Sequence, residues 1–244
     1  MSESLLNPDL DRAALRERFL RDGRVQVESV LRPDFADAVH DGLAGPVPWR
    51  LMYYNHDGQG AEVVGRLEPE KRRALGPAGL AELEQRVVEQ ARDRFQYYYE
   101  AYDVLDARRR GLDPQPYLQR FLDFMGSDEL FEFIADISGD TQFNRVDCHA
   151  CRYGPGHFLK EHADISPFEQ RRMAYVFYFT RDWHADFGGI TCFLDDQGRI
   201  EDALLPGYNS LTLFRVPVAH NVTQVAAFAP RPRHSITGWF TRYG

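Results

Sequence analysis

The spacing of hydrophobic positions changes near residue 140, and this change separates two kinds of predicted structure. Before it, apolar residues recur every three or four positions, the period of a helix with one buried face. After it, β-branched and aromatic runs of five to nine residues alternate with glycine, proline and aspartate clusters, which is typical of antiparallel strands joined by turns. We therefore expect a mostly helical part over residues 1–140 and a β-rich part over residues 141–244.

The helical part should begin with a helix that Asp11 caps and Gly23 ends, and Pro33 should open a second one. Between them, residues 24–30 resemble a short strand. The longest helix should follow Pro77, because an apolar stripe continues at helical spacing through Leu80, Leu83, Val87, Ala91, Phe95, Tyr98 and Tyr102. We interpret this stripe as core packing. Two shorter helices are predicted over residues 116–124 and 128–137.

The β-rich part should supply seven or eight strands, over residues 143–153, 158–161, 173–180, 190–194, 210–216, 221–226 and 235–240. This number and pattern predict a jelly roll, also called a double-stranded β-helix. The fold class is therefore mainly β with a helical buttress, in which the helices cover one sheet and bury its apolar face. A length of 244 residues fits one domain, with 1–140 as support and 141–244 as the jelly-roll core.

Charge and composition narrow the classes of function. A formal net charge of -8 argues against a protein that coats nucleic acid and mildly suits a basic protein substrate. No apolar run is long enough to span a membrane, and the first residues do not resemble a secretion signal, so we expect a cytoplasmic protein. The three cysteines give no disulfide framework, and we interpret Cys148 and Cys151 as strand cysteines rather than a redox pair.

Three side chains suggest a metal site. In His162-Ala163-Asp164, the histidine and the aspartate can share one face of an extended segment, although such a triplet often arises by chance. His220 follows several predicted strands later, and a jelly roll can bring it beside the triplet. Two imidazoles and one carboxylate form the facial triad of non-haem iron(II) oxygenases, which leaves three metal positions open.

A dianionic co-substrate such as 2-oxoglutarate would also need a cation for its distal carboxylate, and the planar fork of arginine suits this task. Arg233 is the candidate, because Ser235 shares its strand face and can donate to the same carboxylate. Arg231 is a rival, but it lies between prolines, where a loop is expected.

Five sequence blocks, in order, resemble the prolyl-hydroxylase-like 2-oxoglutarate oxygenases, and most of all the branch that includes the ribosomal-protein prolyl hydroxylases. The blocks are Tyr153-Gly-Pro-Gly, His162-Ala-Asp164, Trp183 with Gly188-Gly189, His220-Asn-Val-Thr-Gln-Val and Pro232-Arg233-His-Ser235-Ile-Thr-Gly238-Trp239-Phe240. The resemblance covers about a hundred residues, from Phe143 to the end of the chain.

The resemblance implies that iron(II) is bound by His162, Asp164 and His220, and that Arg233 with Ser235 anchors 2-oxoglutarate. It also implies that dioxygen is consumed, with ascorbate as an optional reductant, and that Tyr153 and Tyr178 point hydroxyls toward the co-substrate or are core tyrosines bonded elsewhere. The glycine pair Gly188-Gly189 would permit a tight turn and close backbone approach.

The implied reaction is hydroxylation of an unactivated C–H bond, with release of succinate and carbon dioxide. The substrate would be a prolyl residue of a protein or peptide, or a small amino-acid-like molecule. Two alternatives stay open, namely a jelly-roll metalloenzyme that does not use 2-oxoglutarate and a non-catalytic binding module. The first 140 residues match no substrate-reading motif, and residues 55–65 are either a lid over the site or a plain surface loop.

Overall fold

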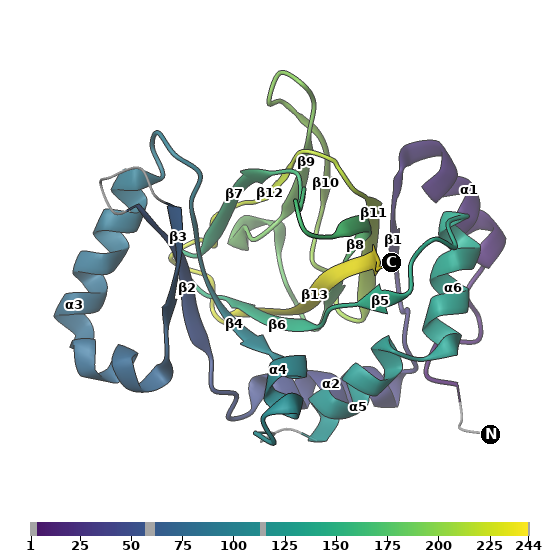
Figure 1. Cartoon of the computed structure of the whole chain (residues 1–244), viewed down its shortest axis with the longest axis horizontal. Helices are drawn as coiled ribbons and strands as arrows, with labels where there is room; N and C mark the ends of the chain where they lie inside the picture. The colour runs from purple at the N-terminus through teal and green to yellow at the C-terminus, as the bar shows by residue number, and fades with distance from the viewer. Residues whose placement is uncertain (1–3, 57–61, 113–115, 244) are drawn as a thin grey trace.

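A nearly closed antiparallel sheet dominates the computed structural model, which describes residues 4–56, 62–112 and 116–243 (Figure 1). Ten of its strands follow one another around the sheet in the order β1 (Arg24–Val27), β11 (Ser210–Arg215), β8 (Gln170–Tyr178), β13 (Arg233–Arg242), β6 (His149–Tyr153), β4 (Tyr97–Asp103), β7 (Phe158–His162), β12 (His220–Val222), β9 (Thr191–Leu194) and β10 (Ile200–Leu204). The predicted jelly-roll fold is confirmed.

The two ends of this path are linked by side chains rather than by a strand ladder. Arg24 of β1 donates from Nε to Asp202 of β10 at 2.8 Å and from Nη2 to Glu201 at 3.1 Å. The open end of the sheet is therefore closed by a forked arginine contact between its first and last strands.

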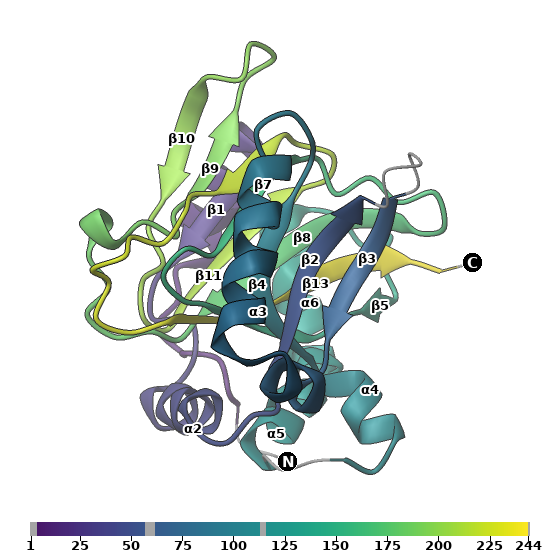
Figure 2. The ribbon, with the colours of Figure 1, turned by 90° about the vertical axis from the view of Figure 1, so that its left-hand side faces the viewer.

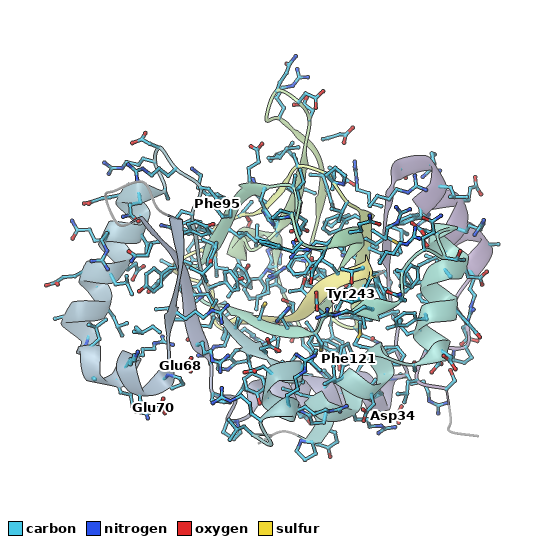
Figure 3. All side chains as sticks on the ribbon, in the orientation of Figure 1. Asp34, Glu68, Glu70, Phe95, Phe121 and Tyr243 are labelled. Carbon is cyan, nitrogen blue, oxygen red and sulfur yellow. The ribbon has the colours of Figure 1, made fainter. Side chains whose placement is uncertain are left out.

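Helices cover the outer face of the sheet, as expected (Figure 1). They are α1 (Arg12–Asp22), α2 (Pro33–Ala44), α4 (Val104–Arg109), α5 (Pro116–Met125) and α6 (Asp128–Ser138). Alternate residues of β8 point toward them, so Phe121 of α5, labelled in Figure 3, packs edge-on against Phe177 with ring centroids 5.3 Å apart. Asp11 caps α1 and Gly23 ends it with a left-handed backbone, as the sequence predicted.

An arm of two further strands extends the sheet beyond the barrel. β2 (Arg50–His56) pairs with β4 and with β3 (Glu62–Leu67), while the short β5 (Arg145–Val146) pairs with β13. The helix α3 (Pro69–Gln90) lies along the outer face of this arm, where Leu83 and Val87 pack against Leu51 and Tyr98 (Figure 2). The inner face of the arm stays open toward the barrel.

The helix predicted after Pro77 is present, following a kink at Gly76, but its predicted continuation through Tyr102 was wrong. The helix ends at Gln90, and residues 97–103 form β4, the strand that joins the two halves of the sheet. Residues four apart share a face in a helix and also in a strand, so the pair Tyr98 and Tyr102 fits both periods. Glu100 lies between them and shares their outer face, which distinguishes the strand from the helix.

Glu100 is a buried carboxylate that ties this strand to its neighbours. Its side chain is 4% exposed and accepts hydrogen bonds from Arg72 of α3 and from Arg152 of β6, whose Nη2 lies 2.8 Å away. Burial alone would raise the pKa of Glu100, but the hydrogen bonds and charges of the two arginines outweigh burial and hold the pKa below its ordinary 4.5.

Replacing Glu100 by glutamine should lower the free energy of unfolding by about 2 kcal/mol near neutral pH, because two arginines lose their carboxylate while staying partly exposed. A carboxyl whose pKa is lower in the folded state stabilises the fold above its unfolded pKa and loses that effect as the pH falls through the folded value. Urea titrations should therefore show the gap between Glu100→Gln and the wild type closing on acidification below about pH 5. Glu132→Gln, on the exposed face of α6, is the control and should change little; a constant gap at every pH would contradict the account.

Candidate active site

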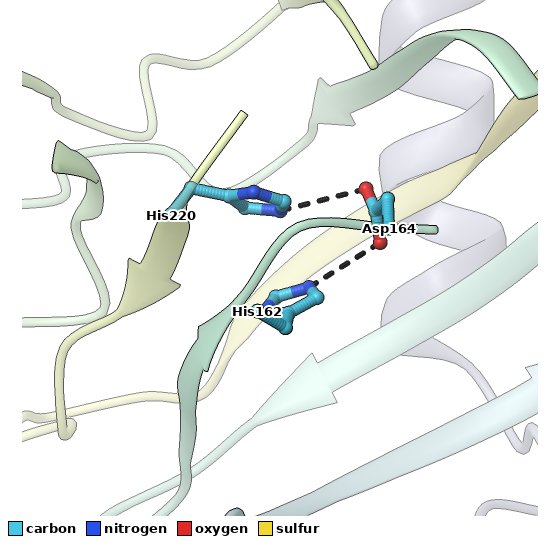
Figure 4. Close-up of side chains that lie close together, drawn as sticks. All are labelled: His162, Asp164 and His220. Atoms are coloured by element: carbon cyan, nitrogen blue, oxygen red, sulfur yellow. Dashed lines mark ion pairs between the residues drawn. The ribbon is translucent and has the colours of Figure 1, made fainter. Parts of the chain in front are cut away.

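The two histidines of the predicted triad face each other across neighbouring strands. His162 is the last residue of β7 and His220 the first of β12, and the two are register partners. Asp164 follows two residues after His162 with a φ of 56°, and this left-handed turn directs its carboxylate toward both rings (Figure 4). Its Oδ1 lies 3.4 Å from His162 Nε2 and its Oδ2 3.5 Å from His220 Nε2.

Both imidazoles are held in the form that a metal requires. Nδ1 of His162 lies 2.9 Å from the carbonyl of Lys160, and Nδ1 of His220 lies 2.9 Å from the carbonyl of Val218. A carbonyl oxygen can only accept, so each Nδ1 carries a proton, which leaves Nε2 of each ring as the nitrogen that can bind a metal.

The electrostatics of the triad agree with this arrangement. Burial, helped by the neighbouring His162, lowers the pKa of His220 to about 4, which keeps its ring neutral. Burial would raise the pKa of Asp164, but the hydrogen bond from His162 and the two imidazoles lower it below its usual value. One ligand atom from each residue lies within 4.8 Å of the others, so the described residues fit a metal ion with two neutral nitrogens and one carboxylate.

The triad lines a cavity that Arg233 also lines. Arg233 is the first residue of β13. Its side chain is 2% exposed, and its Nε has no hydrogen-bond partner among the described residues. The guanidinium lies between the rings of Tyr153 and Tyr178, 5.0 and 4.8 Å from their centroids. A buried guanidinium with an unpaired donor is costly, so the site fits an anionic ligand such as a carboxylate.

The remaining predicted residues surround this arginine. Ser235 lines the cavity and is the register partner of both Cys151 and Tyr178. The Tyr153 side chain lines the cavity wall, whereas the Tyr178 hydroxyl is 2.9 Å from the Thr191 hydroxyl, with either group able to donate. The structure therefore brings Tyr153 and Ser235 to the cavity and gives the Tyr178 hydroxyl a protein partner.

The predicted glycine pair lies against the Arg233 side chain and the backbone of Gln224. Gly188 has a φ of 68°, and a Cβ there would lie 2.1 Å from the carbonyl oxygen of Gln224. Gly189, with a φ of 63°, would place a Cβ 3.1 Å from Cδ of Arg233. Close backbone approach thus explains both glycines, as the sequence predicted.

The sequence analysis missed several residues of the cavity, whose volume is about 710 Å³. Phe95, Tyr97 and Tyr99 form one wall, and Phe95, labelled in Figure 3, lies 6.1 Å from the His162 ring between centroids. They were missed because they were assigned to a helix. Alternation of aromatic residues at 95, 97 and 99 was the available signal.

Arg171 and Trp239 line the cavity at another side, near Asp164. The Arg171 guanidinium stacks 3.6 Å from the centroid of the Trp239 ring and donates from Nη1 to the carbonyl of Asp164 at 3.2 Å. Nε1 of Trp239 is buried without a hydrogen-bond partner in the described ranges, whereas Nε of Arg171 lies 3.5 Å from a carboxylate oxygen of Glu169. One donor, Nε1 of Trp239, is therefore available beside the metal ligands for an acceptor on a bound molecule.

The other predictions are resolved as follows. The rival Arg231 lies outside the cavity, half exposed, with Asp182 as its ion-pair partner at 3.7 Å. Cys148 and Cys151 are free and pack in different clusters. Within residues 55–65, interpreted as either a lid or a surface loop, 55–56 and 62–65 belong to β2 and β3, and 57–61 lie outside the described residues. No helix in the described ranges is long and apolar enough to cross a membrane.

Comparisons with known proteins point to one group. Residues 148–241 match the family model described as the 2OG-Fe(II) oxygenase superfamily, the same segment that carries the sequence motifs. The chain is 27% identical to the prolyl 3-hydroxylase OGFOD1 of Mus musculus over 151 residues, which is 59% of this chain and 26% of the mouse protein. The aligned part thus spans about a quarter of that relative.

Solved structures share the fold. A Pseudomonas putida prolyl-4-hydroxylase superposes with a TM-score of 0.57 at 22% identity, covering 96% of this chain and all of that one. A Trichoplax adhaerens prolyl hydroxylase, in complex with a hypoxia inducible factor oxygen degradation domain peptide fragment, gives 0.59 at 14% identity and covers 94% and 88% of the two chains. At these identities, the likeness concerns the fold.

Proposed function

We propose that this chain, whose residues 148–241 match the family model of the 2OG-Fe(II) oxygenase superfamily, is an iron(II)- and 2-oxoglutarate-dependent dioxygenase that hydroxylates a prolyl residue or a proline-like substrate. The observation that carries the proposal is the presence, in one cavity, of a His-Asp-His triad and of a buried arginine with an unpaired donor. A metalloenzyme that did not use 2-oxoglutarate would have no use for such an arginine.

In this proposal His162, Asp164 and His220 hold the iron, while Arg233 and Ser235 hold the distal carboxylate of 2-oxoglutarate. Bound iron(II) and 2-oxoglutarate together supply the activation of dioxygen that oxidises a C–H bond, with release of succinate and carbon dioxide. The chain's own residues bind and orient these groups, and the buried surroundings of Arg233 exclude water from the co-substrate end. Ascorbate would serve only as an external reductant.

Two observations support the proposed class of substrate, namely the aromatic wall of the cavity and the names of the similar proteins. Phe95, Tyr97 and Tyr99 offer an apolar aromatic surface next to His162, which suits the apolar face of a pyrrolidine ring. The similar mouse protein is named a prolyl 3-hydroxylase, and two structural neighbours are named prolyl hydroxylases. We propose a prolyl residue in a peptide or protein, with Nε1 of Trp239 donating to its backbone carbonyl.

Anaerobic titration of the iron(II)-loaded protein with 2-oxoglutarate tests the co-substrate first. We expect a visible metal-to-ligand charge-transfer band, and no band would count against direct chelation. Admission of air with a proline-containing peptide pool should then give succinate and a mass gain of one oxygen on peptides. Succinate without any oxidised peptide would retain the oxygenase and reject the prolyl substrate, whereas oxidised peptides formed without 2-oxoglutarate would reject the dependence on this co-substrate.

A further inference from the structure

One row of side chains crosses the inner face of the sheet from the buried end of the cavity to the open arm. Pairing registers place Arg233 of β13 beside Tyr153, Tyr99 beside Met52, and Met52 beside Arg66 of β3, and the rings of Tyr153 and Tyr99 stack 5.0 Å apart. Strands lie about 4.8 Å apart, so the two arginines that end this row are roughly 19 Å apart at the backbone. One is buried at the co-substrate end, and the other is exposed on the arm.

Arg66 faces two hollows at once. It lines the main cavity and also a side hollow of about 200 Å³, which continues along the inner face past Ala101 and His149. Arg66 lies near Tyr97, where its charge offsets part of the rise that burial gives the pKa of that tyrosine. Within the part of the chain that the structure describes, no carboxylate pairs with Arg66.

The other charged groups around these hollows have partners. Arg50 pairs with Glu68 at 3.0 Å, Arg171 with Glu169 at 3.5 Å, and Asp103 lies 3.9 Å from His149. At the proposed centre, the negative charge of Asp164 equals the positive charge of Arg233 in the free protein. The charges of iron(II) and 2-oxoglutarate cancel each other, so binding them leaves this balance unchanged. The uncompensated charge that a substrate meets is therefore that of Arg66.

Distance decides which part of a substrate would meet this charge. Arg66 is two strand spacings, roughly 10 Å, from Tyr99, the ring of which stacks on Tyr153 inside the cavity. A carboxylate on the oxidised residue itself would stay close to the triad. A neighbouring residue of an extended peptide advances roughly 3.5 Å per position along the chain, and its side chain reaches further. The spacing fits a side chain one or two residues away.

We propose that Arg66 is a specificity residue that binds an acidic side chain of a peptide substrate, one or two residues from the residue that is oxidised. This inference rests on the proposed function. It reverses the expectation from the net charge of -8, because the charge at the mouth of the cavity, rather than the total, acts on a bound peptide.

Fluorescence anisotropy with labelled decapeptides tests the inference without turnover. Each peptide carries one proline in an alanine-rich sequence, with glutamate, glutamine or lysine one or two positions away. Binding is measured to the metal-free protein and, anaerobically, to the protein loaded with iron(II) and 2-oxoglutarate. At low salt we expect the glutamate peptides to bind about three- to fivefold more tightly than the glutamine peptides, the size of an exposed ion pair, and the lysine peptides to bind weakest.

Two substitutions and a control make the result specific. Arg66→Gln should abolish the preference for glutamate, and Arg66→Glu should transfer it to lysine. Arg73→Gln removes the same charge from an exposed site of α3 that pairs with Glu70 outside the cavity, and it should keep the wild-type preference. An equal glutamate preference in wild type and Arg66→Gln, or no measurable binding of any peptide, would overturn the inference. A glutamate preference that depends on Arg66 without any oxidised product would keep the inference and reject the proposed reaction.

Discussion

Removing the carboxylate of Asp164 should abolish iron retention and lower succinate formation by a factor on the order of 10³ or more, equivalent to about 4 kcal/mol of lost stabilisation. The carboxylate is the only charged donor between two neutral imidazoles, so its loss leaves a weak pair of nitrogens. Asp164 has a φ of 56°, where alanine would add strain of its own. Asp164→Gly and Asp164→Asn both tolerate that backbone and therefore separate loss of the ligand from loss of the fold.

Iron retention would be measured after gel filtration with a colorimetric chelator, and succinate by mass spectrometry. The chain supplies a matched control, because the tripeptide His-Ala-Asp occurs a second time at residues 184–186. There, His184 and Asp186 lie 3.4 Å apart with side chains 71% and 77% exposed. Asp186→Gly should retain iron and activity. Full activity in either Asp164 variant would reject this aspartate as a metal ligand.

The repeated tripeptide also shows what the sequence could decide at the site. Local pattern alone does not separate residues 162–164 from residues 184–186. His220, together with the jelly-roll topology that makes it the register partner of His162, made the first triplet the candidate. Likewise, Arg233 was preferred to Arg231 because it shares a strand face with Ser235 while Arg231 lies between prolines, and the structure does bury Arg233 and expose Arg231.

The parts that were missed share a physical cause. The hydrophobic pattern predicted the strands after residue 140 except β10, whose residues Ile200–Leu204 are mostly exposed and carry no buried alternation. In the first 140 residues, β4 was assigned to a helix, because both periods fit its tyrosines. That single error hid the arm, the aromatic wall and Arg66, since all of these depend on pairing with β4 or β2. The local spacing of hydrophobic residues does not determine which strands, far apart in the sequence, pair with each other.

Replacing Arg233 by methionine should raise the stability of the ligand-free protein while abolishing its response to 2-oxoglutarate. In the free protein, the guanidinium is buried with an unpaired Nε, and two aromatic faces offset only part of this cost. A flexible apolar side chain of similar length removes the cost, so the free energy of unfolding should rise by about 1–3 kcal/mol. The same change should weaken 2-oxoglutarate binding by a factor on the order of 10², because a buried charge-assisted contact is lost.

Thermal unfolding with and without 2-oxoglutarate measures both effects at once. The wild type should melt at a higher temperature when the co-substrate is present, because a ligand that binds only the folded state stabilises it. Arg233→Met should melt above the ligand-free wild type and should not respond to the co-substrate. Arg231→Met, at the exposed neighbouring arginine, should behave as the wild type does. An Arg233→Met protein that is still stabilised by 2-oxoglutarate would mean that another group holds its distal carboxylate. A variant that is more stable without ligand and binds 2-oxoglutarate more weakly would indicate that Arg233 serves binding and destabilises the fold. A purely structural arginine could not produce this combination.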